Sequence, residues 1–357
     1  MPKKGTLLVN LGSPDSPESS DVRRYLDEFL NDPRVIDIPT AVRKPLVSLG
    51  VAPLRAPSSA EAYEEVWTDE GSPLILTTES LAESLRERVE GPVEIGMRYG
   101  NPSIKSGVRE LVDRGVDELF LIPLYPHYAM SSYETVVART REVIDELGVQ
   151  LDLTVQPPFY DDPDYIDALV DSAEDYLERD FDMLLFSYHG VPVRHIKKGD
   201  PSGCYCLKDE DCCRKPNPVH GMCYRHQCHA TTWEFCEKAG IPPEKYNVAF
   251  QSRVGPDAWL EPFTADELER MPSAGIKDVL VMCPAFVSDC LETIEEIGME
   301  GRETFLEAGG DSFDLIPCLN ENEAWIDVLH KFIDTFESDE YAPKQSRQVG
   351  ASTQITQ

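Results

Sequence analysis

One histidine stands where catalytic side chains are often found, at the end of an apolar run. The run 183–186 leads into Ser187-Tyr-His-Gly-Val-Pro, and a glycine follows His189 directly. In parallel sheets the carboxyl ends of the strands border the ligand crevice, so this imidazole could face a cleft. Its ordinary pKa of about 6.5 suits proton exchange at neutral pH. A lone histidine that only hydrogen-bonds to backbone is the simpler alternative.

Carboxylates recur at helical spacing further along the chain. Asp289, Glu292 and Glu296 stand at i, i+3 and i+7, which is one face of a helix. Like charges in a row destabilise a helix mildly, and solvation is the usual reason that they are tolerated. Binding of a divalent cation is the functional alternative, because hard carboxylate oxygens would hold the ion weakly and fit a delivery path.

Cysteines are crowded into one segment. Ten are present, and seven of them lie between Cys204 and Cys236. The amino terminus runs directly into an expected strand and has no apolar region of the signal-peptide type. In such a chain, crowded thiols indicate a metal or a cluster before disulfides. We therefore expect a metal or cluster site in the block 202–226.

A third string, Phe250-Gln-Ser-Arg-Val-Gly-Pro-Asp-Ala-Trp, follows another apolar run. An arginine, a Gly-Pro turn and a tryptophan after a strand would make a shaped wall for a flat aromatic ligand. A plain strand and turn would explain the Gly-Pro pair but not the whole string.

The elements that would position these residues alternate along the chain. Near-continuous apolar runs, each followed by an amphipathic stretch, predict parallel strands covered by helices on both faces. The expected helices are Ser19–Leu30, Thr78–Val89, Ser132–Leu147, Tyr165–Leu177, Ala265–Met271 and Glu323–Phe336. The expected strands are Thr6–Asn10, Val93–Arg98, Glu118–Leu124, Leu151–Gln156, Met183–Tyr188, Asn247–Gln251, Asp278–Cys283 and Phe313–Pro317.

A break near 158–165 divides the strands four and four, which predicts an α/β fold of two similar lobes with a cleft between them. The expected lobes are 1–160 and 161–337, and 338–357 is expected to be a disordered tail. The Pro-rich, apolar stretch 39–58 is either an ordinary packed loop or an apolar lip beside a ligand cleft or a membrane.

The charge composition limits the classes of partner that the protein could bind. The 357 residues carry a net charge of −32, from 65 acidic and 33 basic residues. This balance argues against nucleic acid, because phosphate contacts need clustered Lys and Arg. We interpret the excess of acidic residues as a hydrated, negatively charged surface. No stretch approaches the roughly 18 apolar residues of a spanning helix, so the expected location is the cytoplasm, with peripheral contact at the inner face of the membrane as an option.

Seven motifs follow an order that resembles the ferrochelatase family. They extend from about residue 5 to residue 335, nearly the whole chain apart from the Cys-rich block and the tail. Motifs this long and this numerous rarely match by chance. The motifs are Asn10-Leu-Gly-Ser-Pro-Asp, Met97-Arg-Tyr-Gly-Asn-Pro, Pro123-Leu-Tyr-Pro-His-Tyr, Ser187-Tyr-His-Gly-Val-Pro, Gly199-Asp-Pro, Phe250-Gln-Ser-Arg-Val-Gly-Pro and Val287-Ser-Asp-Cys-Leu-Glu-Thr.

The resemblance implies a lyase that inserts Fe²⁺ into a porphyrin, the last step of haem biosynthesis, with the ring held between two Rossmann-like lobes. Matched by position, His189 meets the pyrrole nitrogens as proton acceptor, iron ligand or both. Glu292 is its acidic partner, and Asp289 and Glu296 continue the carboxylate line that delivers the metal. The positions that match porphyrin contacts are Leu11, Arg55, Arg98 and Tyr125.

Three places depart from the family pattern. Cys290 stands where a histidine is common two residues before the acidic partner, although a thiolate could also bind iron. Pro57 and Ser58 make the rim near Arg55 less basic. Leu11 replaces a tyrosine that marks relatives acting on coproporphyrin, so protoporphyrin IX is the expected substrate.

The resemblance also identifies the Cys-rich block as an insert, because most relatives pass almost directly from Gly-Asp-Pro to the segment at Gln227. Some ferrochelatases bind a 2Fe–2S cluster through four cysteines, and a few do so through an internal insert. We expect four of five inserted thiols as ligands, with Cys206, Cys223 and either Cys212 or Cys213 foremost. The five are Cys204, Cys206, Cys212, Cys213 and Cys223.

Several alternatives stay open at this point. Structural zinc, held by cysteines and His220, competes with the cluster, and disulfides come third. The chain could instead be another tetrapyrrole chelatase, acting on cobalt or on coproporphyrin, since imidazole and carboxylate ligands do not exclude Co²⁺ or Zn²⁺. A non-catalytic iron–sulfur sensor on a chelatase scaffold is the third reading, and the presence of both His189 and Glu292 weighs against it.

Overall fold

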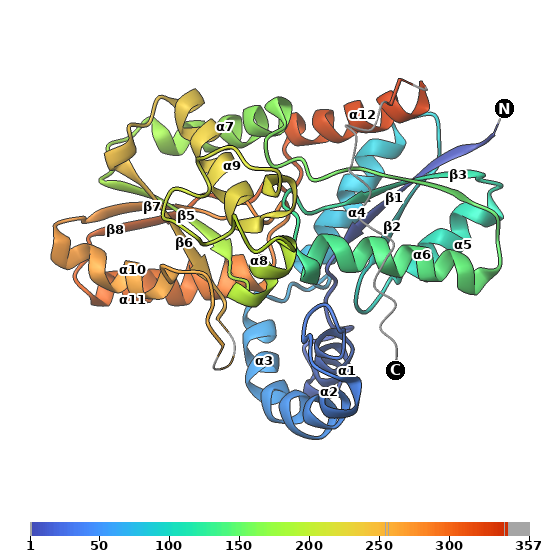
Figure 1. Cartoon of the computed structure of the whole chain (residues 1–357), viewed down its shortest axis with the longest axis horizontal. Helices are drawn as coiled ribbons and strands as arrows, with labels where there is room; N and C mark the ends of the chain where they lie inside the picture. Colours follow the sequence, from blue (N-terminus) through green and yellow to red (C-terminus); the bar gives the residue numbers. More distant parts are fainter. Residues whose placement is uncertain (1, 254, 256, 339, 342–357) are drawn as a thin grey trace.

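Eight parallel strands form two separate sheets in the computed structural model, which describes residues 2–253, 255, 257–338, 340 and 341 (Figure 1). The strand order is β2-β1-β3-β4 in the N-terminal sheet and β6-β5-β7-β8 in the C-terminal sheet. All eight expected strands are present, four on each side of the break. They are β1 (Lys4–Asn10), β2 (Val93–Met97), β3 (Glu118–Pro123), β4 (Asp152–Val155), β5 (Met183–His189), β6 (Tyr246–Gln251), β7 (Asp278–Met282) and β8 (Ser312–Leu315).

Helices connect the strands. The six expected ones are present, Ser19–Leu30 with the predicted ends and the other five with shifted ends. The α-helices outside the lip are α1 (Ser19–Leu30), α4 (Pro73–Arg86), α5 (Ile104–Asp113), α6 (Thr135–Leu147), α7 (Pro163–Leu177), α8 (Val193–Gly199), α9 (Tyr224–Ala239), α10 (Thr264–Arg270), α11 (Arg302–Glu307) and α12 (Glu323–Glu337). Shorter helical segments are η2 (Met130–Glu134), η3 (His220–Met222), η4 (Pro243–Lys245), η5 (Met271–Ala274) and the π-helix η6 (Glu292–Gly301).

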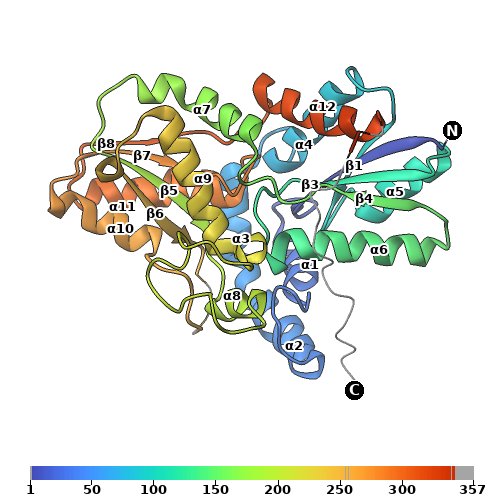
Figure 2. The same cartoon turned by 45° about the horizontal axis from the view of Figure 1, so that its top comes forward.

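Both faces of each sheet are covered, which explains why the strands are apolar throughout rather than alternating. Leu7 and Val9 of β1 face α5 and α6, whereas Leu8 between them faces α4 and α12. In the C-terminal sheet, α7 and α9 lie on one face and α10, α11 and η6 on the other (Figure 2).

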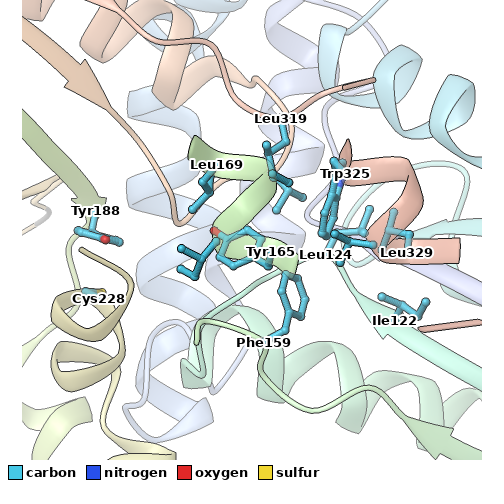
Figure 3. Packing of buried hydrophobic residues seen from close by; sticks show 14 of the residues in the cluster. Ile122, Leu124, Phe159, Tyr165, Leu169, Tyr188, Cys228, Leu319, Trp325 and Leu329 are labelled. Carbon is cyan, nitrogen blue, oxygen red and sulfur yellow. The ribbon is translucent and has the colours of Figure 1, made fainter. Parts of the chain in front are cut away.

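One apolar core extends through both lobes. Figure 3 shows Phe159, Tyr165 and Trp325 packed together where α7 and α12 meet. α12 also covers the N-terminal sheet, since the rings of Phe120 and Phe336 stack with centroids 4.8 Å apart. Each such buried side chain contributes about 1.5–3 kcal/mol, so the two lobes stabilise one another.

The stretch 39–58 is helical, and its interpretation as an ordinary packed loop is wrong. It forms α2 (Thr40–Leu46), a π-turn η1 (Val47–Val51) and the start of α3 (Ala52–Val66). Pro53 stands in the first turn of α3, where a missing N–H costs little. These helices project from the sheets together with α1 (Figure 1). Leu49 and Leu54 are 80% and 81% exposed, and we call the exposed apolar stretch 39–58 the lip.

The Cys-rich insert 202–226 follows α8, extends into the first turn of α9 and consists mainly of turns. The predicted tail 338–357 lies outside the described residues except at Ser338, Glu340 and Tyr341. The Tyr341 hydroxyl donates to the carbonyl oxygen of Val155 at 3.3 Å. Among the residues that the structure describes, no helix is both long enough and apolar enough to cross a bilayer.

Candidate active site

His189 is the last residue of β5 and lies half-buried at the carboxyl end of the C-terminal sheet. Its Nδ1 atom lies 2.7 Å from the carbonyl oxygen of Gly190. A carbonyl only accepts, so Nδ1 carries the proton of the neutral ring and donates it. The lone pair is therefore on Nε2, the atom that can take a proton or bind a metal.

Gln251 joins His189 to Glu292. It stands opposite His189 in the β5–β6 ladder, and its Nε2 donates to the backbone carbonyl of Glu292 at 2.9 Å. Its Oε1 accepts from the hydroxyl of Ser187 at 2.6 Å and from the thiol of Cys283 at 3.7 Å. The two predicted catalytic residues thus lie one side chain apart. Sequence reasoning did not single out Gln251, although it stands in the motif Phe250-Gln-Ser-Arg-Val-Gly-Pro.

Glu292 is the first residue of the π-helix η6, and Asp289 lies before this helix. The prediction that Asp289, Glu292 and Glu296 share one face of a regular α-helix is therefore wrong. The carboxylate of Asp289 accepts from the hydroxyl of Thr293 at 2.8 Å and from the side-chain amide of Asn320 at 2.6 Å. These bonds tie the Asp289 carboxylate to the first turn of η6 and to Asn320.

Glu296 lies one turn beyond Glu292 and close to His189. Its carboxylate accepts from the backbone N–H of Ser252 at 2.7 Å and from the Ser252 hydroxyl at 2.5 Å. Burial raises the pKa of Glu296, with Glu292 adding to the rise, while Ser252 and His189 act in the opposite direction. The carboxylate is therefore positioned to balance a positive charge on the imidazole.

The acidic row continues toward the surface at Glu295. Burial raises its pKa to about 7, and the surrounding carboxylates of Glu300, Glu296, Glu65 and Glu292 add to the rise. Such a row holds protons that a divalent cation can replace, because the cation relieves the same repulsion.

Cys290 is next to this row. The residue is 7% exposed, its thiol donates to the carboxylate of Glu292, and burial raises the pKa of the thiol. Cys290 and Glu292 line a narrow pocket together with Tyr25 and Tyr63. The pocket encloses about 10 Å³, far less than a tetrapyrrole needs.

Two of the predicted porphyrin contacts border this region. The hydroxyl of Tyr125 is buried and has no hydrogen-bond partner among the described residues. The negative charge of Glu292 acts on this hydroxyl. An orphaned buried hydroxyl indicates a partner supplied by a ligand or water. Leu11 packs into an apolar cluster that includes Leu291 and Ile294.

The two predicted arginines differ in their surroundings, and the charge of Arg98 also acts on Tyr125. Arg98 forms an ion pair with the buried carboxylate of Asp32 and donates from Nε to the hydroxyl of Thr135 at 2.7 Å. Its side chain is 12% exposed, so Arg98 supports the fold at this point rather than offering a free charge to a propionate. Arg55 lies exposed on α3, in the lip.

Four of the five inserted thiols lie together, and we call Cys206, Cys212, Cys213 and Cys223 the buried thiol group. They are 3 to 7% exposed, whereas Cys204 is exposed. Hydrogen bonds from Cys213 and then from Cys206 lower the pKa of Cys223 to about 6, against the effect of burial. In the described part of the chain, no three ligating side chains are arranged to hold a metal ion.

Two neighbours define the surroundings of these thiols. Arg225 donates to the sulfurs of Cys212 and Cys213 at 3.6 and 3.4 Å, which favours thiolates there. The Nε2 atom of His220 lies 2.6 Å from the side-chain amide nitrogen of Asn217 and 3.1 Å from the carbonyl oxygen of Cys212, so this nitrogen already has partners.

Solved structures define the class of fold. The chain matches SirB from Bacillus subtilis with Fe³⁺ with a TM-score of 0.53, and the sirohydrochlorin chelatase SirB from Bacillus subtilis subspecies spizizenii in complex with cobalt with a TM-score of 0.54. Both matches have 11% identity and cover 95% of this chain and 97% of the other. At this identity the likeness concerns the fold alone, which is the two-lobed fold of the chelatases.

Sequence comparisons identify the family. The ferrochelatase family model matches residues 3–336. A ferrochelatase of Opitutus terrae is 52% identical over 94% of this chain and 98% of its own, and one of Azotobacter vinelandii is 50% identical over 90% and 96%. The chain belongs to the ferrochelatase family, the lyases that insert Fe²⁺ into a porphyrin to make haem.

Proposed function

We propose that this protein inserts Fe²⁺ into protoporphyrin IX and forms protohaem in the last step of haem biosynthesis. The observation that carries the proposal is the placement of His189, with Nε2 as its free acceptor, close to the carboxylate of Glu296, which lies one turn beyond Glu292 on η6. Insertion exchanges two pyrrole N–H protons for one Fe²⁺. It therefore needs a proton acceptor and a route for a cation, and this site offers both.

In the proposed reaction, Nε2 of His189 accepts a pyrrole proton while Nδ1 keeps its bond to Gly190. Glu296 balances the positive charge that develops on the ring. Fe²⁺ arrives along the carboxylate row and passes from Glu295 toward Glu292, since hard oxygen ligands release it readily. The second pyrrole proton leaves to solvent, so one porphyrin and one Fe²⁺ give haem and two protons.

Porphyrin binding requires a rearrangement beside Glu292. The pocket there is far smaller than the ring, and helices α1 and α3 supply its walls through Tyr25 and Tyr63. The lip helices must shift to admit the ring. A site that binds the ring bent exposes the pyrrole lone pairs and stabilises the transition state over the flat substrate.

Leu11 favours protoporphyrin over coproporphyrin. It lies in an apolar cluster with Leu291 and Ile294, which suits an apolar vinyl edge. A coproporphyrin propionate in the same place would lose hydration without gaining a charged partner.

The test is an anaerobic assay of the wild-type chain with Fe²⁺ and protoporphyrin IX, followed by loss of porphyrin fluorescence. Parallel reactions replace the porphyrin by coproporphyrin or the metal by Co²⁺. We expect the fastest loss with Fe²⁺ and protoporphyrin. No loss with Fe²⁺ and either porphyrin would refute the proposed activity, and a faster reaction with coproporphyrin would refute the substrate.

We also propose that the buried thiol group holds a 2Fe–2S cluster. Four thiols are a fitting donor set, and their burial beside Arg225 supports bound thiolates. When bound, the cluster would supply ordering free energy and one-electron chemistry. Zinc on the same thiols is the competitor, and the engagement of His220 with Asn217 and the Cys212 carbonyl disfavours a zinc site that includes it. Visible absorption with iron, sulfide and zinc analysis of the purified protein distinguishes the two.

The lip suits peripheral contact with a membrane. Its exposed apolar side chains are 48 to 81% exposed and lie within α2, η1 and the first turn of α3. Burial of such side chains at the acyl boundary, rather than charge attraction, would drive binding, because the chain is strongly acidic. The side chains are Val42, Leu46, Leu49 and Leu54.

A further inference from the structure

Tyr224 lies between the Cys-rich insert and the active site. It follows Cys223 directly and is the first residue of α9. The residue is 5% exposed, and its hydroxyl donates to the backbone carbonyl oxygen of His189 at 2.8 Å. A side chain that belongs to the end of the insert therefore contacts the proposed proton acceptor.

The peptide that Tyr224 contacts is held at both of its polar atoms. The carbonyl of His189 accepts from Tyr224, and the N–H of Gly190 donates to the carbonyl of Gln251 at 2.7 Å. The chain can approach this closely only because residue 190 is glycine, since a Cβ there would lie 2.7 Å from the Gln251 oxygen. The next carbonyl, that of Gly190, then accepts from Nδ1 of the imidazole.

These contacts link the Tyr224 hydroxyl to the tautomer of the ring. The Gly190 carbonyl belongs to the next peptide, and a rotation of the His189–Gly190 peptide that changes φ of Gly190 would move this carbonyl away from Nδ1. The Nδ1–H bond is what leaves Nε2 as the acceptor. Removing one of the two fixed points should therefore loosen the preference for this tautomer.

The base of the insert is closed, so its folding governs where Tyr224 lies. The carboxylate of Asp200 accepts from the backbone N–H groups of Tyr205 and Cys206 at 2.8 and 2.9 Å. At the other end, a Cβ on Gly199 would lie 2.8 Å from the carbonyl oxygen of Met222. The two ends of the insert pack against each other beside the first turn of α9.

We infer that Tyr224 is a positioning residue that couples the folding of the Cys-rich insert to the orientation of His189. The inference rests on the proposed function in one respect, that His189 accepts the pyrrole proton. Ordering of the buried thiol group fixes the start of α9. The Tyr224 hydroxyl then fixes the His189–Gly190 peptide, and this peptide positions the Gly190 carbonyl that sets the imidazole tautomer.

The first test is Tyr224→Phe in the full-length chain, with Tyr205→Phe as the control. Tyr205 belongs to the same insert, and its side chain is 38% exposed. Loss of one positioning hydrogen bond predicts that kcat falls about tenfold while KM for the porphyrin stays unchanged. Imidazole nitrogen NMR shifts, assigned with His189→Gln, should show a smaller share of the Nδ1-protonated form. Unchanged kcat and tautomer in Tyr224→Phe would overturn the inference.

The second test asks whether the insert acts through Tyr224. Cys206→Ser should shift the His189 tautomer in the wild-type background but add nothing in the Tyr224→Phe background. If Cys206→Ser does not fold, Cys212→Ser serves the same purpose. Equal shifts in both backgrounds, or none in either, would refute the coupling. The NMR readout needs no turnover, so failure of iron insertion would refute the proposed function separately.

Discussion

The side-chain amide of Gln251 donates to the backbone carbonyl of Glu292 at 2.9 Å, and this bond fixes the end of β6 to the start of the π-helix η6. Gln251 is also the ladder partner of His189. One buried amide thus sets the relation between the proposed proton acceptor and the helix that carries the carboxylate row.

Replacing Gln251 by leucine should uncouple the two halves of the site. The carbonyl of Glu292 would lose its partner and the hydroxyl of Ser187 would keep only Thr264, so the free energy of unfolding should fall by about 1–3 kcal/mol. We expect kcat to fall as well. Gln156→Leu is the matched control, because Gln156 is equally buried at the end of the neighbouring sheet and accepts from Tyr341. Wild-type kcat in Gln251→Leu would contradict the role given to the amide.

The raised pKa of Glu295 predicts a pH-dependent stability. Its pKa is about 7 in the folded chain against an ordinary 4.5, so the folded state holds the proton more tightly than the unfolded state. Its contribution to stability is therefore present below pH 4.5 and is lost as the pH rises through 7. Glu295→Gln should be more stable than wild type by about 1 kcal/mol at pH 8 and nearly equal at pH 4.5.

Urea unfolding at the two pH values measures this difference. Glu303→Gln, at the start of α11 and exposed, is the control and should change little at either pH. A Glu295→Gln variant that is less stable than wild type at pH 8 would contradict the repulsion within the row.

All eight strands could be predicted from the sequence, because helices cover both faces of each sheet and each strand is therefore a dense apolar run. His189 and Glu292 also followed from the order of motifs. The lip helices were missed because prolines indicate loops, although Pro53 fits the first turn of α3 and Pro45 is accepted inside α2.

Other features depend on partners that are distant in the chain. Arg98 pairs with Asp32, and the Asp289 carboxylate accepts from Asn320. Neither partner can be predicted from the spacing of neighbouring residues in the sequence. The π-helix at Glu292 escaped prediction for a related reason. An i→i+5 turn is selected by packing against neighbouring elements, and its residues look like those of an ordinary amphipathic helix.

The buried thiol group and the exposed Cys204 predict opposite outcomes within one insert. Cys223→Ser should remove the visible absorption of the cluster and lower the thermal midpoint, because a metal-bound insert loses the free energy that orders it. Cys204→Ser should leave both unchanged. Unchanged colour and stability in Cys223→Ser would exclude Cys223 from the ligand set. Loss of colour in Cys204→Ser would show that the buried thiol group is not the correct set of four ligands.

The lip should govern binding to membranes. Leu49→Gln with Leu54→Gln removes its two most exposed leucines, and we expect sedimentation with phosphatidylethanolamine–phosphatidylglycerol vesicles to fall at least fivefold, since each leucine contributes roughly 1 kcal/mol or more. Met299→Gln with Leu306→Gln is the control, because these side chains are also exposed but lie on the C-terminal lobe. Equal vesicle binding by both double variants would argue against a lip-specific contact.

The most direct test of the account is Fe²⁺ insertion into protoporphyrin by His189→Ala, followed by fluorescence loss and compared with wild type and with His330→Ala on α12. We expect the rate of His189→Ala to fall at least about a hundredfold, with an unchanged circular dichroism spectrum, because the only proposed imidazole acceptor is gone. His330→Ala should keep the wild-type rate. Wild-type turnover by a folded His189→Ala protein would contradict the central claim.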